Sequence, residues 1–94
     1  AVITESAGSG NADLRKRDLY FTITTQFYRM MAVLVGSRLE ILRLYNRRTD
    51  PKELLDLSKD PKHADIIMQL RSYLENERAD LLDMRGYRRT EKSD

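Results

Sequence analysis

Fifteen carboxylates and a single histidine are the side chains of this sequence to consider first for acid, base or metal chemistry, because cysteine is absent. Without cysteine, disulfides, thiol catalysis and thiolate metal sites are excluded. His63 has no second histidine with which to share a metal ion, so we assign it no role. Asp56, Asp60 and Asp65 could gather on one side of a turn, but their spacing is typical of a solvated, helix-capping surface. We therefore predict no catalytic residue, no metal site and no cofactor, and expect that the chain is not an enzyme.

The elements that must position these side chains fit in one domain at most, since the chain has 94 residues. Hydrophobic residues make up 40% of the sequence and charged residues 34%, with four Gly and two Pro, which favours a soluble and helical chain. The net charge of +2 is small, so binding to nucleic acid, which needs several phosphates neutralised, is not expected.

Residues 12–48 fit two competing templates. A helical period of 3.6 places polar or small residues along one stripe from Thr22 to Arg47 and leaves a mostly apolar stripe opposite. That stripe comprises Leu19, Ile23, Phe27, Met30, Leu34, Ile41, Leu42 and Tyr45. A hairpin stays open as the alternative, because Gly36–Ser37 suits a two-residue turn and residues 22–25 are rich in β-branched side chains. We favour the helix.

Two Asp-Pro pairs predict two further helices. Asp50–Pro51 reads as an N-cap followed by a first-turn proline, opening a short helix through Leu57. Asp60–Pro61 repeats the device and opens a helix over residues 61–85, ending where Gly86 can adopt a left-handed conformation.

The buried stripe of this last helix is predicted to include Leu70 and Leu74, one turn apart, while Glu75 and Arg78 are placed on its solvated side.

The predicted fold class is all-α. A long N-terminal amphipathic helix, a short connecting helix and a second helix fold back as a helical hairpin or small bundle. Residues 1–11 are expected to be an extended N-terminal arm, residues 12–86 a single helical domain and residues 87–94 a polar C-terminal tail. The alternative is an α+β fold with a small antiparallel sheet and a C-terminal helix.

Surface residues suited to docking fall into two groups. A dense apolar and aromatic patch is the candidate partner-binding surface, because one long helix cannot cover apolar residues on both flanks within so small a fold. It comprises Tyr20, Phe21, Phe27, Tyr28, Met30 and Met31. Candidate basic contacts are Arg43, Arg47, Arg48, Arg85, Arg88 and Arg89.

One local pattern resembles a known family. From Leu44 the chain reads L-Y-N-R-R-T-D-P-K-E-L-L-D-L-S-K-D-P, which is similar to L-Y-D-L-x-x-D-P-x-E-x-x-N-L-x-x-D-P near the C-terminus of sulfatases. The resemblance covers residues 28–76 and implies a small sheet and a helix appended to a catalytic domain, with residues 28–45 as a hairpin. Asn46–Arg47 replaces the family's D-L, and the chain has neither the cysteine-containing nucleophile motif nor a metal-binding set of Asp and His. Sulfatase activity of this chain is therefore not implied.

The leading functional hypothesis is a non-catalytic accessory or assembly subunit that docks on a larger protein complex through helical apolar surface and the N-terminal arm. The alternative is a detached C-terminal subdomain of a sulfatase-like hydrolase, and the third is a small basic nucleic-acid-binding protein. Arg29 and Gln26 interrupt the apolar run of residues 19–35, so no membrane span is expected, although a partner complex could bring the chain to a membrane. The start at Ala1 suggests a trimmed N-terminus, which allows an organelle or an exported compartment.

Overall fold

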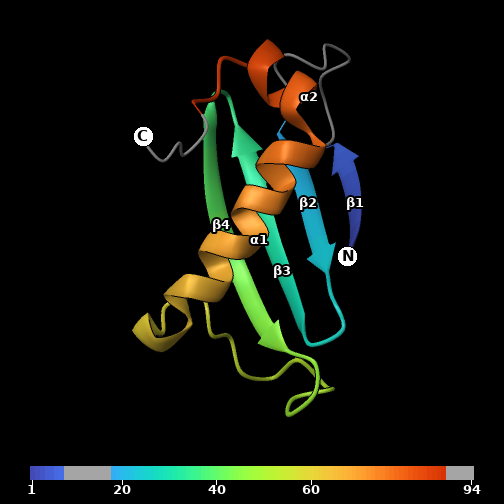
Figure 1. Cartoon of the computed structure of the whole chain (residues 1–94), viewed down its shortest axis with the longest axis vertical. Coiled ribbons are helices and arrows are strands. Elements are labelled where there is room, and N and C mark those ends of the chain that lie inside the picture. Colours follow the sequence, from blue (N-terminus) through green and yellow to red (C-terminus); the bar gives the residue numbers. More distant parts are fainter. Residues whose placement is uncertain (8–17, 89–94) are drawn as a thin grey trace.

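A four-stranded antiparallel sheet carries helices on one of its faces in the computed structural model, which describes residues 1–7 and 18–88 (Figure 1). Its elements, in chain order, are β1 (Val2–Ala7), β2 (Leu19–Thr24), β3 (Tyr28–Val35), β4 (Arg38–Asn46), the 3₁₀ turn η1 (Pro61–His63), α1 (Ala64–Glu77) and α2 (Ala79–Met84). The strands lie in the order β1-β2-β3-β4. The all-α prediction is therefore wrong, and the alternative of a small antiparallel sheet with a C-terminal helix describes the structure.

Residues 19–34 follow a period of two rather than 3.6. Leu19, Phe21 and Ile23 of β2 are buried, and so are Met30 and Leu34 of β3, which alternate with less buried neighbours or with residues on the other face. Several members of the expected helical stripe are thus core residues of strands. The β-branched residues at 22–25, which disfavour a helix, were the better signal.

The β3–β4 hairpin turns at Gly36–Ser37, where the sequence allowed a two-residue turn. Val35 pairs with Arg38 across it, and Gly36 has a φ of 61°, which glycine adopts without a side-chain clash. A bulge between Met31 and Ala32 in the pairing register adds one residue to β4 at Leu42.

α1 crosses the sheet and closes the core on one side (Figure 1). Leu70 and Leu74 are buried against core residues of the sheet, which confirms their predicted place on the buried stripe. Glu75 was expected on the solvated side, but it is only 3% exposed and accepts a 2.6 Å hydrogen bond from the Tyr87 hydroxyl. The predicted helix of residues 61–85 is interrupted at Arg78, which separates α1 from α2.

The remaining boundaries also differ from the predictions. Within the expected arm, residues 1–11, Val2–Ala7 form the edge strand β1, and residues 8–11 lie outside the described part of the chain. The expected helical domain, residues 12–86, contains three of the four strands. In the expected tail, residues 87–94, Tyr87 is buried and residues 89–94 are outside the description.

The short helix expected after Asp50 is absent, since the described residues 51–60 form turns and irregular backbone. Asp60 does cap the next element as predicted, because its side chain accepts a hydrogen bond from the Lys62 amide at the start of η1. Gly86 has the predicted left-handed conformation, with a φ of 74°.

Candidate docking surface

The carboxylates between β4 and α1 build the loop rather than an acid and base pair. Asp56 Oδ1 accepts hydrogen bonds from the Leu44 amide at 3.0 Å and the Ser58 amide at 2.9 Å, which fixes the loop against the edge of β4. The Leu57 amide donates to the Leu44 carbonyl at 2.7 Å and extends this contact. Asp56 Oδ2 lies 3.4 Å from Arg43. The carboxylate oxygens of Asp56 are thus used in contacts that hold the loop in place.

The pKa values of these carboxylates fit a capping role. Partial burial works against ionisation of Asp56, but the amides of Ser58 and Leu44 outweigh it and hold its pKa below the ordinary range. Hydrogen bonds from the Lys62 amide lower the pKa of Asp60. Each group is therefore held as a carboxylate at neutral pH, when a general acid would need a raised pKa.

His63 Nδ1 lies 3.2 Å from Asp60 Oδ2, and its ring meets the ring of Tyr28 edge-on at 6.4 Å between centroids. These neighbours hold the imidazole at the start of α1. Within residues 1–7 and 18–88, no group of three or more His, Cys, Asp or Glu side chains could hold a metal ion.

The six predicted partner-binding residues divide between the two faces of the sheet and a turn. Phe21 and Met30 are buried in the core and Tyr28 packs against it, so these three contribute to folding. Tyr20 alternates with Phe21 and is 43% exposed on the opposite face of the sheet, as the half-buried Met31 alternates with Met30. Phe27 lies in the β2–β3 turn, equally exposed.

The face of the sheet that points away from α1 is a candidate docking surface, and we call it the open face. No helix or strand of the described residues lies over it (Figure 1), although the loop after β4 reaches it at Arg29, which pairs with Glu53. The strand register places three cross-strand rows on it: Tyr20, Val33 and Glu40; Thr22, Met31 and Arg43; Thr24, Arg29 and Tyr45.

The open face is apolar along β3 and polar at its margins. Val33 is only 5% exposed although α1 lies on the other side of the sheet, and it stands between its cross-strand neighbours Tyr20 and Glu40. β3 is therefore apolar on both faces over residues 30–34, a pattern typical of a strand covered on both sides. This pattern indicates that the open face is suited to contact with another protein surface.

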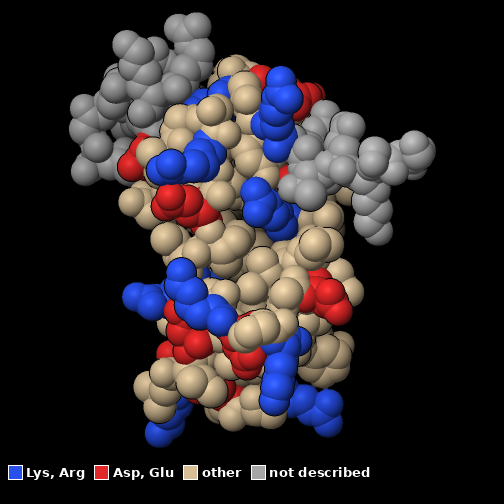
Figure 2. Space-filling view, turned by 90° about the vertical axis from the view of Figure 1, so that its left-hand side faces the viewer, with Lys and Arg blue, Asp and Glu red and all other residues tan. Residues whose placement is uncertain are grey.

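The predicted basic contacts do not converge. Arg43, Arg47 and Arg48 lie on β4 and the loop after it, whereas Arg85 and Arg88 follow α2 at the opposite end of the sheet (Figure 1). The side view in Figure 2 accordingly shows basic and acidic side chains interspersed rather than a single basic patch.

Most of these arginines have local partners. Arg47 donates to the Thr25 carbonyl at 2.5 Å, and the Arg48 guanidinium lies 5.7 Å from the centre of the Phe27 ring. Arg85 is 7% exposed and donates to the Gly36 carbonyl at 3.1 Å, so it ties the end of α2 to the β3–β4 turn.

Arg88 is exposed. Arg89 lies outside the described residues.

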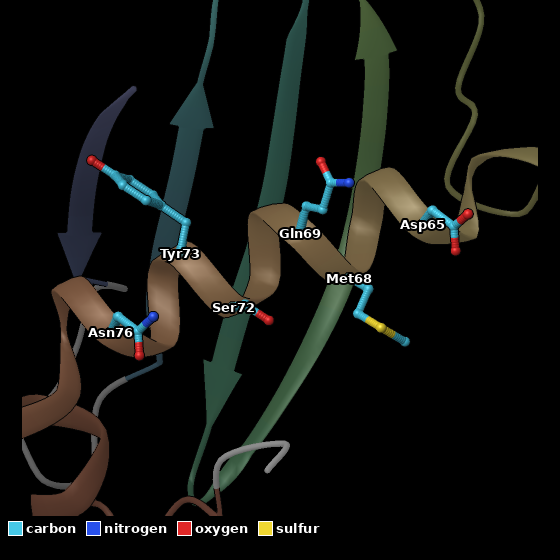
Figure 3. A pocket seen from close by; sticks show the side chains of 6 residues that line it. All are labelled: Asp65, Met68, Gln69, Ser72, Tyr73 and Asn76. Carbon is cyan, nitrogen blue, oxygen red and sulfur yellow. The ribbon is translucent and has the colours of Figure 1, made fainter. Parts of the chain in front are cut away.

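A hollow runs along α1, and Figure 3 shows the side chains that line it: Asp65, Met68, Gln69, Ser72, Tyr73 and Asn76. Tyr73 points toward β1, where its hydroxyl donates to the Ala1 carbonyl at 3.2 Å. All six side chains come from one helix, so they do not surround a ligand with converging polar groups as a binding pocket does.

Sequence reasoning missed two features of the surface. The open face was hidden by the helical interpretation, although the unbroken apolar run of residues 30–35 was its signal. The pair Leu54–Leu55 was assigned to a helix, yet Leu54 is 82% exposed and Leu55 63% exposed.

Comparison of the chain with protein-family models, with curated proteins and with solved structures finds no match. Within the described residues, no helix combines the length and the apolar character that crossing a membrane requires.

Proposed function

We propose that this chain is a non-catalytic C-terminal subdomain of a sulfatase-like hydrolase, which packs on the rest of that enzyme through the open face. The observation that carries the proposal is the run from residue 28 to residue 76. The residues whose spacing resembles the sulfatase segment belong here to one continuous unit, consisting of the β3–β4 hairpin, a carboxylate-braced loop and the capped helix α1.

Each spaced acidic residue of the pattern has a structural task in that unit. Asp50 accepts from the Leu54 and Leu55 amides, and Glu53 pairs with Arg29 on β3 at 3.1 Å. Asp56 and Asp60 brace the end of the loop and the start of η1, as described above. The spacing thus reflects how a strand is joined to a helix, which supports the comparison with an appended subdomain and requires no catalytic group in this chain.

Two of the three departures from the family pattern, those at residues 46 and 56, are compatible with the same unit; the third is Arg47, which stands where the pattern has Leu. Asn46 stands where the pattern has Asp, and its side-chain oxygen accepts from the Arg48 and Thr49 amides at 3.0 and 3.1 Å, as a carboxylate could. Asp56 stands where the pattern has Asn, and either side chain offers an oxygen to the Leu44 amide.

Docking through the open face is supported by the apolar character of β3 on both sides. A single layer of helix leaves Met31 half-buried and Tyr20 exposed, and a second protein surface would cover both. In the proposed enzyme this surface belongs to the catalytic domain, which supplies the cysteine nucleophile and the metal ligands that this chain lacks.

The second candidate function is that of a non-catalytic subunit of another protein complex. It also docks through the open face but has no relation to sulfatases. The mixed apolar and polar open face favours it equally, but the long helix on which that hypothesis rested is replaced by strands, and Val2–Ala7 of the expected arm form β1. Nucleic-acid binding has less support, because the predicted basic contacts lie at two ends of the molecule.

The test is to isolate the native polypeptide with an antibody raised against residues 28–76 and to map it by mass spectrometry. The proposal expects one polypeptide that is much longer than 94 residues, that contains a cysteine nucleophile motif with Asp and His ligands, and that hydrolyses an aryl sulfate. Recombinant residues 1–94, as the matched control, should have no such activity.

A native species of the same size as the recombinant chain, bound to separate subunits, would contradict the sulfatase proposal and favour the second candidate. A longer polypeptide without that motif would contradict it as well.

A further inference from the structure

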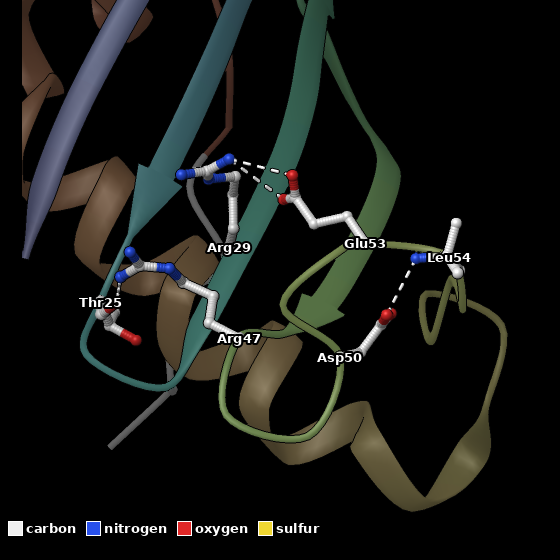
Figure 4. A network of polar contacts seen from close by, with 6 residues as sticks. All are labelled: Thr25, Arg29, Arg47, Asp50, Glu53 and Leu54. Atoms are coloured by element: carbon white, nitrogen blue, oxygen red, sulfur yellow. Dashed lines mark hydrogen bonds and ion pairs between the residues drawn. The ribbon is translucent and has the colours of Figure 1, made fainter.

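One end of the sheet presents exposed apolar side chains among basic ones. The β2–β3 turn and the loop after β4 meet there, at the bottom of Figure 1. The Arg47 amide donates to the Phe27 carbonyl at 2.7 Å. The Arg47 guanidinium donates to the Thr25 carbonyl (Figure 4), so these hydrogen bonds join the two loops. We call this end the apolar tip, and it comprises Phe27, Arg47, Arg48, Lys52, Leu54 and Leu55.

The two leucines of the apolar tip are held outward by the loop itself. Asp50 accepts from the Leu54 amide at 3.0 Å (Figure 4) and also from the Leu55 amide at 2.8 Å. These hydrogen bonds lower the pKa of Asp50, so its carboxylate stays ionised and keeps accepting from both amides at neutral pH.

The residue before the leucines is braced as well. Glu53 has a φ of 56°, a conformation that is costly for a residue other than glycine, and its carboxylate is bound by Arg29 at 3.1 Å. A loop that keeps Leu54 82% exposed and Leu55 63% exposed under such constraints presents them to something outside the described fold.

The charge around the apolar tip selects an anionic occupant. Arg47, Arg48 and Lys52 are exposed and outnumber the nearby Asp50, whose carboxylate accepts from backbone amides, while the charge of Glu53 is balanced by Arg29. The Arg48 guanidinium lies against the exposed Phe27 ring, which places a cation beside an apolar side chain.

We propose that the apolar tip docks on the surface of an anionic lipid bilayer. Leu54 and Leu55 enter the boundary between headgroups and acyl chains, and the arginines and lysine stay among the lipid phosphates. A bilayer accepts a convex loop without a matching cavity, which a protein partner would have to provide. The inference does not rest on the sulfatase proposal, since it uses only the residues of the tip.

The test is sedimentation of the full chain with vesicles made of equal parts phosphatidylcholine and phosphatidylserine, and with vesicles of phosphatidylcholine alone. The wild-type chain should bind the anionic vesicles, bind the neutral ones far less and lose binding as salt is raised. Leu54→Ser with Leu55→Ser should weaken binding to anionic vesicles at least about tenfold, because burying one leucine is worth about that factor or more.

Met68→Ser is the matched control, because Met68 is 54% exposed on α1, away from the tip. It should bind like the wild type, and thermal melts should show that all three proteins are folded. No binding of the wild type to anionic vesicles, equal binding to both vesicle types, or undiminished binding of the double variant would each overturn the proposal. Absence of vesicle binding together with loss of a co-purifying protein in the double variant would assign the tip to a protein pocket instead.

Discussion

Replacement of Leu74 by alanine should remove a large part of the packing of α1 on the sheet. Leu74 has no exposed surface and lies in the same buried cluster as the core residues of β2, β3 and β4. Truncating a fully buried leucine costs about 2–5 kcal/mol, from the lost apolar transfer and the cavity left behind. A domain of this size has a total stability of about 5 kcal/mol or somewhat more, so the variant should lose much of it.

The measurement is thermal unfolding followed by far-UV circular dichroism. A loss of 1 kcal/mol lowers the Tm of a small domain by about 4–8 °C, so Leu74→Ala should melt at least about 10 °C below the wild type or fail to fold. Met68→Ala, on the exposed side of the same helix, is the matched control and should change stability by no more than about 0.5 kcal/mol. Equal melting of the two variants would refute the packing of α1 on the sheet.

Three further predictions concern the polar contacts. Asp56→Ala should lower the urea midpoint more than Asp56→Asn, because asparagine keeps an oxygen acceptor for the Leu44 amide; equal midpoints would contradict this role. Because the folded pKa of Asp56 is lowered, its ionised form stabilises the fold above about pH 4, and this contribution should be lost as pH falls through the folded pKa. Asp56→Asn should therefore show a shallower acid loss of the urea midpoint than the wild type. Tyr87→Phe removes the hydroxyl that donates to buried Glu75 and should cost about 1–3 kcal/mol in a thermal melt, whereas an unchanged Tm would show that the contact is dispensable.

The part of the fold that the sequence predicts well is the segment with unambiguous local chemistry. Asp60–Pro61 caps the start of η1, Leu70 and Leu74 fall on the buried side of α1, and Gly86 takes its left-handed conformation. Each of these features depends on residues close by in the sequence, so the local sequence is enough to predict it.

The sheet was missed because β3 is apolar on both faces. The alternation of apolar and polar residues that identifies a strand is visible only where one face of the strand is polar. Met31 and Val33 are apolar residues on the side away from α1, so this alternation is missing from β3. Spacings of four residues, such as Leu19 to Ile23, fit a helix and a strand equally well. The same apolar second face that obscured the fold is the candidate docking surface.

Contacts between distant residues account for the other misses. Glu75 looked solvated from its helix position, but it is buried by Tyr87, which follows it by 12 residues. Asp50–Pro51 looked like a helix start, but Glu53 turns to Arg29 on β3 and the backbone takes a left-handed φ there. The conformation that exposes Leu54 combines that tertiary contact with the hydrogen bonds from the Leu54 and Leu55 amides to Asp50.

Chemical labelling of the open face tests the central claim most directly. The chain has no cysteine of its own, so Tyr20→Cys on the open face and Asn76→Cys on the exposed side of α1 each introduce one thiol in its peptide. Alkylation of each peptide is measured by mass spectrometry in the isolated chain and in the native polypeptide or complex. We expect residue 20 to be labelled readily in the isolated chain and strongly protected in the native assembly, with residue 76 labelled equally in both. Equal labelling of residue 20 in the two states would contradict docking through the open face.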